Sequence, residues 1–334
     1  EEFEGEDPIE IIKQGNTLGI GNIAYGSFGW QPTGPWRADL GLRLHHYSLT
    51  GQVYFEPRLT ASYQISEPWH LKAGYGHNHQ FFGEIIQLDL NQVSASTPIW
   101  VLADGDDFDV SRAREATLGA IGKTSDWTFD IEAYYKTISN LPALNLLPGD
   151  DMEEPNFDPG RARTLGLDVL VKKRWKNFRS WVIYSISKSD WQFDEISTGF
   201  FPANNDRRHQ FKWVTTYEAN GWLASLGWRY NSGVPNIPIS DFTGQFDPMA
   251  YNTINVASDH RLVLSLFYQW EHQQAKGLHG KVGFSLLNIY NRENPLRSSY
   301  RIIDGDFFGE DIIEETPRFG LGFTPNVSFS IGWR

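Results

Sequence analysis

Two histidines, His77 and His79, stand two positions apart in a segment, 69–80, in which apolar and polar residues alternate. Side chains two positions apart on a strand share a face, so both imidazoles could bind one metal ion. No third ligand is apparent beside them, and a pair of histidines near the end of a strand is the alternative interpretation. We therefore predict no metal site from this pair.

The run Asp206-Arg207-Arg208-His209 concentrates charge over consecutive residues. Arginine side chains bind anionic groups through paired hydrogen bonds, so the run could hold an anionic part of a substrate. The alternative is a structural network at the outer end of a strand. The residues that we expect at such an outer rim are His77, His79, Arg207, Arg208 and His209.

Carboxylates gather in three segments without regular alternation. Such clusters can bind Ca²⁺ through their oxygens, but none has the spacing of an EF-hand loop. Solvated acidic loops are the simpler interpretation, so the sequence predicts no cofactor and leaves Ca²⁺ in these loops open. The clusters are Asp104, Asp106, Asp107 and Asp109; Asp150, Asp151, Glu153 and Glu154; and Asp304, Asp306, Glu310, Asp311, Glu314 and Glu315.

No arrangement typical of a catalytic site occurs in the sequence. There is no HExxH, no GxSxG, no P-loop, and no GxGxxG between a strand and a helix. The chain contains no Cys, which excludes thiolate sites and disulfides. The formal net charge of −12 argues against nucleic acid as a partner, because phosphate binding needs a basic face. We predict a protein that is not an enzyme and has no catalytic residue.

The elements that would position these residues are strands, and the last stretch, 325–334, shows this most clearly. Val327, Phe329, Ile331 and Trp333 alternate there with small or polar residues. A period of two places the four large apolar side chains on one face. A soluble half-buried strand could show this pattern too. A closing strand with an aromatic near its end and a polar face of small groups is typical of an outer-membrane barrel.

Similar alternation recurs along the chain and predicts about thirteen strands. The first of them is weakly patterned, so twelve strands is the alternative count. The segments are 17–30, 36–45, 55–65, 69–80, 111–124, 126–138, 161–174, 178–190, 205–218, 222–230, 259–271, 278–291 and 325–334.

The connections between these strands alternate in length. Short turns at 31–35, 66–68, 125–126, 175–177, 219–221 and 272–277 alternate with links that are long from 81–110 onward. In an up-and-down meander every second connection lies at the same end, so one end has tight turns and the other has large loops. A Greek-key sandwich would mix the two kinds.

Composition agrees with a barrel wall. Aromatic residues make up 15% of the chain, enough for girdles at both membrane interfaces. No apolar run approaches the roughly eighteen residues of a membrane helix. The predicted fold class is all-β, a transmembrane antiparallel up-and-down β-barrel, and a soluble β protein is the alternative.

Several short motifs occur within or next to the predicted strands. They are Phe55-Glu56-Pro57-Arg58-Leu59, Leu71-Lys72-Ala73-Gly74-Tyr75-Gly76-His77-Asn78-His79-Gln80, Gly166-Leu167-Asp168-Val169, Phe201-Pro202-Ala203-Asn204-Asn205-Asp206-Arg207-Arg208-His209, Asn231-Ser232-Gly233-Val234-Pro235, His260-Arg261-Leu262 and Thr324-Pro325. Each motif alone is weak. Their order and spacing together resemble TonB-dependent outer-membrane receptors of the Bacteroidetes type, over nearly the whole chain.

The resemblance implies a barrel of about 22 strands filled by an N-terminal plug. Residues 1–334 would be the C-terminal part of that barrel, with the plug and the early strands absent from this chain. An odd strand count and the lack of a signal peptide at Glu1 favour the same expectation. The barrel would lie in the cell outer membrane, among lipid and lipopolysaccharide, with long loops extracellular and the C-terminus periplasmic.

The implied function is active transport of a scarce ligand such as a siderophore, cobalamin, a glycan or a peptide. TonB, with ExbB and ExbD, would act on the missing plug. Charged side chains on the polar face could contact the ligand or the plug, and the sequence does not separate these roles. These lumen candidates are Arg43, Arg58, Lys72, Glu132, Lys172 and Arg229.

Two features depart from the family pattern. The chain ends in Arg334 rather than in an aromatic residue, and the Gly-Tyr-Asp-Pro-Glu type of segment found in SusC-like glycan importers is missing. The second departure lowers the expectation of a surface lipoprotein partner without excluding it. Two alternative functions stay open: a smaller passive channel, and a surface-binding or assembly component built on a transporter-like barrel.

Overall fold

The computed structural model describes residues 17–84, 86–87, 100–106, 108–145, 156–194, 197–236, 238, 252–271, 277–303 and 312–333. Strands, with their turns and connecting segments, make up this part of the chain. Within it, no helix is long and apolar enough to cross a membrane.

Thirteen strands follow one another in a single sheet, and each strand is antiparallel to the next in the order below. This confirms the predicted meander and decides between the counts of twelve and thirteen for the described residues. The strands are β1 (Gly21–Trp30), β2 (Trp36–Tyr47), β3 (Gln52–Ser66), β4 (Trp69–Gln80), β8 (Ser111–Lys123), β9 (Trp127–Asn145), β10 (Asn156–Trp175), β11 (Phe178–Gln192), β13 (His209–Ala219), β14 (Trp222–Asn231), β17 (Asp259–Glu271), β18 (His279–Leu287) and β21 (Thr324–Gly332).

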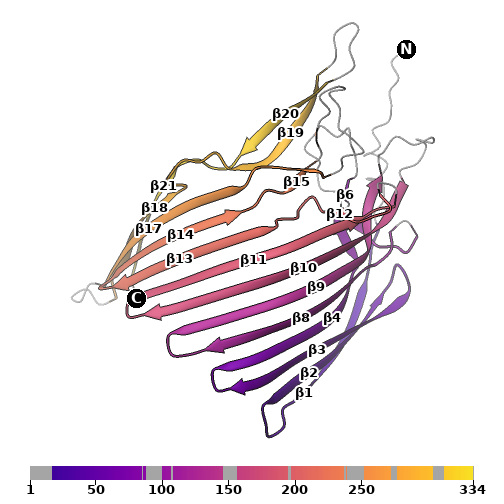
Figure 1. Ribbon diagram of the computed structural model, residues 1–334, viewed down its shortest axis with the longest axis horizontal. Coiled ribbons are helices and arrows are strands. Elements are labelled where there is room, and N and C mark those ends of the chain that lie inside the picture. The colour runs from indigo at the N-terminus through magenta and orange to yellow at the C-terminus, as the bar shows by residue number, and fades with distance from the viewer. Residues whose placement is uncertain are drawn as a thin grey trace.

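Figure 1 shows short turns at one end of the sheet and longer connections at the other, as the spacing of the connections predicted. The turn between β13 and β14 contains only two residues. Asn220 and Gly221 have φ angles of 50° and 80°, the left-handed pair that a two-residue hairpin turn requires. The C-terminal strand β21 ends at the turn end of the sheet (Figure 1).

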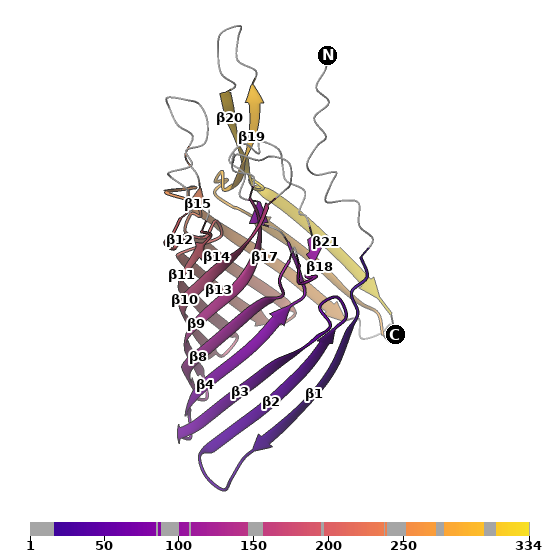
Figure 2. The same cartoon turned by 90° about the vertical axis from the view of Figure 1, so that its right-hand side faces the viewer.

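The long connections contain short strands that the sequence analysis did not anticipate. These are β5 (Phe82–Glu84) with β7 (Trp100–Leu102), β6 (Ile86–Gln87) parallel to β9, β12 (Phe201–Pro202) on β11, β15 (Pro235–Asn236) with β16 (Ile254–Asn255), and β19 (Pro295–Ile303) with β20 (Ile312–Phe319). The sequence analysis predicted no strand between 291 and 325, so the β19–β20 pair was missed. Paired isoleucines at 302–303 and 312–313 favour strands, and the β19–β20 hairpin projects beyond the sheet (Figures 1 and 2).

The sheet has one apolar and one polar face, which the ladders across β14, β17 and β18 show row by row. Leu264 lies directly opposite Leu226 and Leu286 in the register. One position along, Ser265 lies opposite Ser225 and Ser285. Because paired residues of an antiparallel ladder share a face, the leucine row and the serine row lie on opposite sides. Leu264 is 38% exposed, as a residue of an uncovered apolar face would be.

The sheet curves into a trough, and its two outermost strands, β1 and β21, lie along the two edges (Figure 2). β1 is exposed along its whole length. In the described part of the chain no ladder joins β1 to β21, so the outer edge of each strand keeps backbone groups available for another strand.

Burial is concentrated at the loop end, where connecting segments pack on the strands. One cluster consists of Ala162, Trp191, Phe193, Phe201 and Ala203, and another of Tyr47, Phe81, Ala103 and Val110. The Phe193 ring, 1% exposed, lies against Gly160, where a side chain would collide with it. These clusters hold the loop ends of β10 and β11, and of β2, in fixed positions.

Candidate functional site

All six predicted lumen residues lie on the polar face, which can be followed through the paired residues from β2 to β14. Lys72 is opposite Gly119, and Gly119 is opposite Glu132. Glu132 is opposite Asp168, four residues before Lys172 on the same strand face. The same rule places Arg43 and Arg58 on this face of β2 and β3, and Arg229 on this face of β14. Their role toward a ligand or a plug stays a prediction.

Lys72 forms an ion-pair group that spans three strands. Its Nζ lies 2.7 Å from Asp130 Oδ1 and 2.9 Å from Glu132 Oε2, both on β9. The lysine reaches them across Gly119 of β8, where an added Cβ would come within 2.9 Å of the Lys72 Cε. The glycine therefore leaves the space through which the lysine stem passes. Sequence reasoning missed Gly119 because its role depends on the cross-strand register.

Glu56 bridges two strands at the loop end, where their ladder stops. The β3–β4 pairing ends at Arg58 opposite Gly76. Beyond that point the Glu56 carboxylate, which is 3% exposed, accepts a hydrogen bond from the His79 backbone N–H at 2.6 Å. It also accepts a hydrogen bond from Arg43 Nε.

The two predicted rim histidines lie beside this carboxylate. His79 Nδ1 is 3.3 Å from Glu56 Oε1, and the His77 and His79 rings have centroids 4.8 Å apart. The described residues contain no group of three or more His, Asp or Glu side chains that could hold a metal ion. The histidine pair is part of the packed strand end, together with Tyr54 and Phe81.

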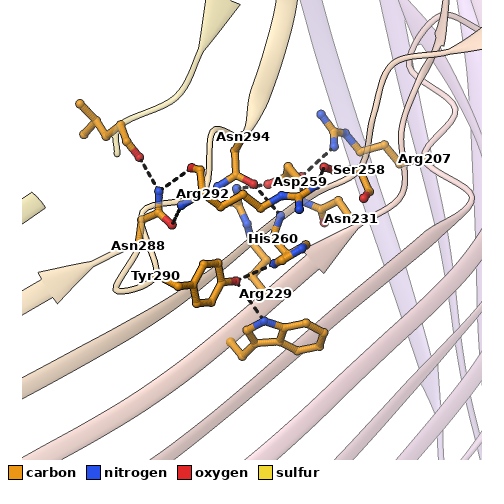
Figure 3. A network of polar contacts seen from close by, with 12 residues as sticks. Arg207, Arg229, Asn231, Ser258, Asp259, His260, Asn288, Tyr290, Arg292 and Asn294 are labelled. Atoms are coloured by element: carbon orange, nitrogen blue, oxygen red, sulfur yellow. Dashed lines mark hydrogen bonds and ion pairs between the residues drawn. The ribbon is translucent and has the colours of Figure 1, made fainter. Parts of the chain in front are cut away.

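Asp259 is the centre of a polar network at the loop end of β14 and β17 (Figure 3). Its Oδ2 lies 2.7 Å from Arg229 Nη2, and its Oδ1 lies 3.2 Å from Arg207 Nη1. Asn231 donates a hydrogen bond of 2.6 Å to Oδ1. The Asn294 side chain accepts a 2.8 Å hydrogen bond from the backbone N–H of His260. The segment that follows β18 is therefore held beside Asp259.

The Asp259 carboxyl group lies above the part of β17 that would cross a bilayer. A crossing strand needs about 9–11 residues, and that number counted from Glu271 at the turn end stops short of Asp259. Burial alone would raise the pKa of Asp259. Hydrogen bonds from Asn231 and Arg229, with the charges of Arg229 and Arg207, outweigh burial and hold that pKa below its ordinary value. The carboxylate is ionised at neutral pH.

The run at 206–209 forms one ion pair within itself and contacts with two other residues, Asp259 and Tyr184. Arg207 pairs with Asp259, and Arg208 Nη2 lies 2.8 Å from the buried carboxylate of Asp206. His209 Nδ1 shares a 2.8 Å hydrogen bond with the Tyr184 hydroxyl. Each charged or polar group of the run therefore has a protein partner that fixes the start of β13.

Two of the lumen candidates, Arg58 and Lys172, form no ion pair within the described part of the chain. Arg58 lines a hollow of about 310 Å³ on the polar face, together with Thr60, Asn78, Glu115 and Thr117. Its floor includes Gly74 and Gly76, which bring the backbone close to the hollow. A cation, a carboxylate, an amide and two hydroxyls could hydrogen-bond a polar ligand group or a polar segment of another domain.

The predicted acidic clusters are only partly within the described residues. Asp104 Oδ1 accepts hydrogen bonds of 3.0 Å from the backbone N–H groups of Asp106 and Phe108, so this side chain closes a turn. Asp107 and the clusters at 150–154 and 304–311 lie outside the described residues, as do the side chains of Glu314 and Glu315. Ca²⁺ in these loops stays a prediction.

Comparison with known proteins gives one family and a common fold. The family model described as "TonB dependent receptor-like, beta-barrel" matches residues 8–291. A search of the curated proteins returned no match to this sequence.

Solved structures show the same fold at low identity. The unliganded ferric citrate transporter FecA is 13% identical over 90% of this chain and 44% of its own, with a TM-score of 0.58. The ferric yersiniabactin uptake receptor FyuA from Yersinia pestis is 12% identical over 93% of this chain and 45% of its own, with a TM-score of 0.63. The copper transporter OprC is 14% identical over 94% and 50%, with a TM-score of 0.61. This chain spans half or less of the length of these structures.

Proposed function

Because the chain belongs to the β-barrel family of TonB-dependent receptors, we propose that it forms the C-terminal part of the barrel of an outer-membrane active transporter. The family match over residues 8–291 carries the proposal, and the meander with its apolar and polar faces agrees with it. Members of this family are outer-membrane receptors and transporters rather than enzymes.

The remaining wall of the barrel would come from strands outside this sheet. The outer edges of β1 and β21 have no partner strand in the described part of the chain. An open sheet edge does not occur in hydrocarbon, because unpaired backbone N–H and C=O groups there cost several kcal/mol each. Further strands would pair with both edges, and a plug would fill the enclosed lumen. The coverage of half or less of the solved structures supports such additional segments.

In this arrangement the apolar face contacts lipid and the polar face lines the lumen. The long connections would be extracellular, and β21 would end at the periplasmic side. The hollow beside Arg58 and the ion-pair group of Lys72 would contact the plug or a passing ligand. TonB, with ExbB and ExbD, would drive the plug movement that opens the path.

The ligand would be one that is too scarce or too large for passive entry: a siderophore, cobalamin, a glycan or a peptide. The test compares three strains, the parent, a receptor deletion and a TonB deletion. Each strain is supplied in turn with radiolabelled ferric citrate, cobalamin, a malto-oligosaccharide and a short peptide. We expect uptake of one ligand to be lost in both deletion strains. Uptake that depends on the receptor but not on TonB would overturn active transport and indicate a passive channel.

A further inference from the structure

Four arginines form a two-by-two array at the loop end of β8, β9 and β10. In the register, Arg112 is opposite Ser139, which is opposite Arg161. Two residues nearer the turn end, Arg114 is opposite Thr137, which is opposite Arg163. The two outer strands supply the guanidinium groups, and the middle strand supplies only small hydroxyl side chains. Paired residues share a face, so the arginines surround a shallow space over β9.

This array lies on the apolar face of the sheet, directly beside its apolar band. The next row toward the turn end consists of Ala116, Tyr135 and Leu165. Leu118, two residues beyond Ala116 on β8, is 64% exposed, and Leu165 is 60% exposed. The arginine array therefore lies where the surface changes from apolar to charged.

The charges of the array are only partly compensated by protein groups. Arg163 Nε lies 3.1 Å from Asp190 Oδ2, and Lys188 Nζ lies 3.3 Å from the same oxygen. The Arg163 guanidinium also lies 4.0 Å above the Phe200 ring, which fixes its position. Asp190 is thus one carboxylate shared between two cations.

The other three arginines form no ion pair within the described residues. Arg112 Nε donates a 3.3 Å hydrogen bond to Ser139 Oγ, and Arg112, Arg114 and Arg161 are exposed. β8 and β10 lie two strand spacings apart, about 10 Å, which is close to one Debye length, so their cations still repel one another weakly. In a chain with a net charge of −12, this local excess of positive charge is a surface that attracts an anionic group.

We propose that this array binds the phosphate groups of an anionic lipid headgroup in the outer leaflet, with the lipid's acyl chains lying along Leu118 and Leu165. Guanidinium groups bind phosphate oxygens through paired hydrogen bonds, and the Thr137 and Ser139 hydroxyls can donate to the same oxygens. The apolar band beside the array favours a lipid over a soluble phosphate. The inference rests on the proposed function in that the apolar face must meet the bilayer.

The test measures lipid binding to the full-length receptor purified in detergent. Bisphosphorylated lipid A is titrated into the receptor, and bound lipid is counted by native mass spectrometry. We expect the triple variant Arg112→Gln, Arg114→Gln, Arg161→Gln to bind at least about tenfold more weakly than the parent. The parent should also bind lipid A without phosphates at least about tenfold more weakly than it binds the bisphosphorylated form. Arg163 is left in place because it packs on Phe200 and pairs with Asp190.

The matched control removes three positive charges at the turn end instead, through Arg37→Gln, Lys173→Gln and Arg179→Gln. Its affinity for bisphosphorylated lipid A should equal that of the parent. Equal affinity of the parent and the first triple variant would overturn the proposal, and so would equal weakening by both triple variants. Parent binding that does not depend on the phosphates would overturn it as well.

A single variant tests the centre of the array without removing any arginine. Thr137→Glu would place a carboxylate between Arg114 and Arg163, where it can pair with both and repel a phosphate. We expect a receptor that keeps the heat-modifiable gel migration of a folded barrel but binds the lipid at least about tenfold more weakly. A folded Thr137→Glu receptor with parental affinity would overturn the proposal. Binding is read without any transport ligand, so its failure is distinguishable from a failure of transport.

Discussion

Arg229 on β14 and Asp259 on β17 form an ion pair at the loop end of the polar face, with Nη2 and Oδ2 2.7 Å apart. The two residues are offset by two positions in the register, because Arg229 lies opposite Arg261 and Asp259 lies opposite Asn231. The carboxylate side chain is 9% exposed, whereas Arg229 and Arg207 are 37% and 36% exposed. A single buried anion is therefore held between two partly exposed cations. The network joins three segments that are distant in sequence.

Asp259→Asn should destabilise the barrel by about 1–3 kcal/mol in the free energy of unfolding, because it leaves two arginines facing a neutral amide. Equilibrium urea unfolding of the full-length receptor in micelles, followed by tryptophan fluorescence, measures the change. The control is Asp39→Asn, whose pair with Arg37 is exposed, at 46% and 61%. It should cost less than about 1 kcal/mol. Equal costs for the two variants would contradict the structural role of Asp259.

The difference in stability between the parent and Asp259→Asn should depend on pH. The folded protein holds the pKa of Asp259 below its ordinary value, so the unfolded chain takes up a proton first as pH falls. The contribution of Asp259 is therefore complete above the unfolded pKa of about 3.9. It is lost as pH falls from there through the lower folded pKa. Unfolding measured from pH 7 to pH 3 should show the difference shrinking below about pH 4, and a difference that grows there would contradict the prediction.

The two faces of β17 should respond oppositely to a charge. Leu264→Arg places a guanidinium in the leucine row and should cost about 2–4 kcal/mol if that row crosses the middle of the bilayer. Ser265→Arg places the same group in the serine row and should be mild, because that row would face water. Folding yield into lipid vesicles and urea unfolding measure both variants. Similar losses for the two would contradict the assignment of the faces.

Much of this fold is predictable from the sequence because strand alternation and turn composition are local signals. The period-two pattern around Leu264 assigns its face correctly, and Asn220-Gly221 marks its turn. The β19–β20 hairpin was missed because isoleucine pairs inside a long, acidic connection give only a weak strand signal.

The sequence predicts which face of the sheet the site residues lie on, but it does not predict which residues they contact. Alternation placed Lys72, Arg43 and Arg229 on the polar side. Their partners depend on the register between strands, which no single segment encodes. Glu56 fills the end of a ladder, and Gly119 leaves space for a lysine on the neighbouring strand. Both roles appear only when three strands are aligned.

Lys72 should couple energetically to Glu132 through their 2.9 Å ion pair. Lys72→Met leaves Asp130 and Glu132 without their shared cation, and we expect a loss of about 1–2 kcal/mol in the free energy of unfolding. Glu132→Gln removes one of the two repelling charges, so it should cost less in the Lys72→Met background than in the parent. A double-mutant cycle by urea unfolding should give a coupling of about 0.5–1.5 kcal/mol.

The control for this cycle is Arg58→Met, a cation on the same face without an ion pair among the described residues. It should change the free energy of unfolding by less than about 0.5 kcal/mol. Lys72→Met that costs no more than Arg58→Met would contradict a stabilising role for the lysine. A Glu132→Gln cost that is the same in both backgrounds would show that the two side chains act independently. The expected result instead means that Lys72 links β4 to β9 across Gly119 through its ion pairs with Asp130 and Glu132.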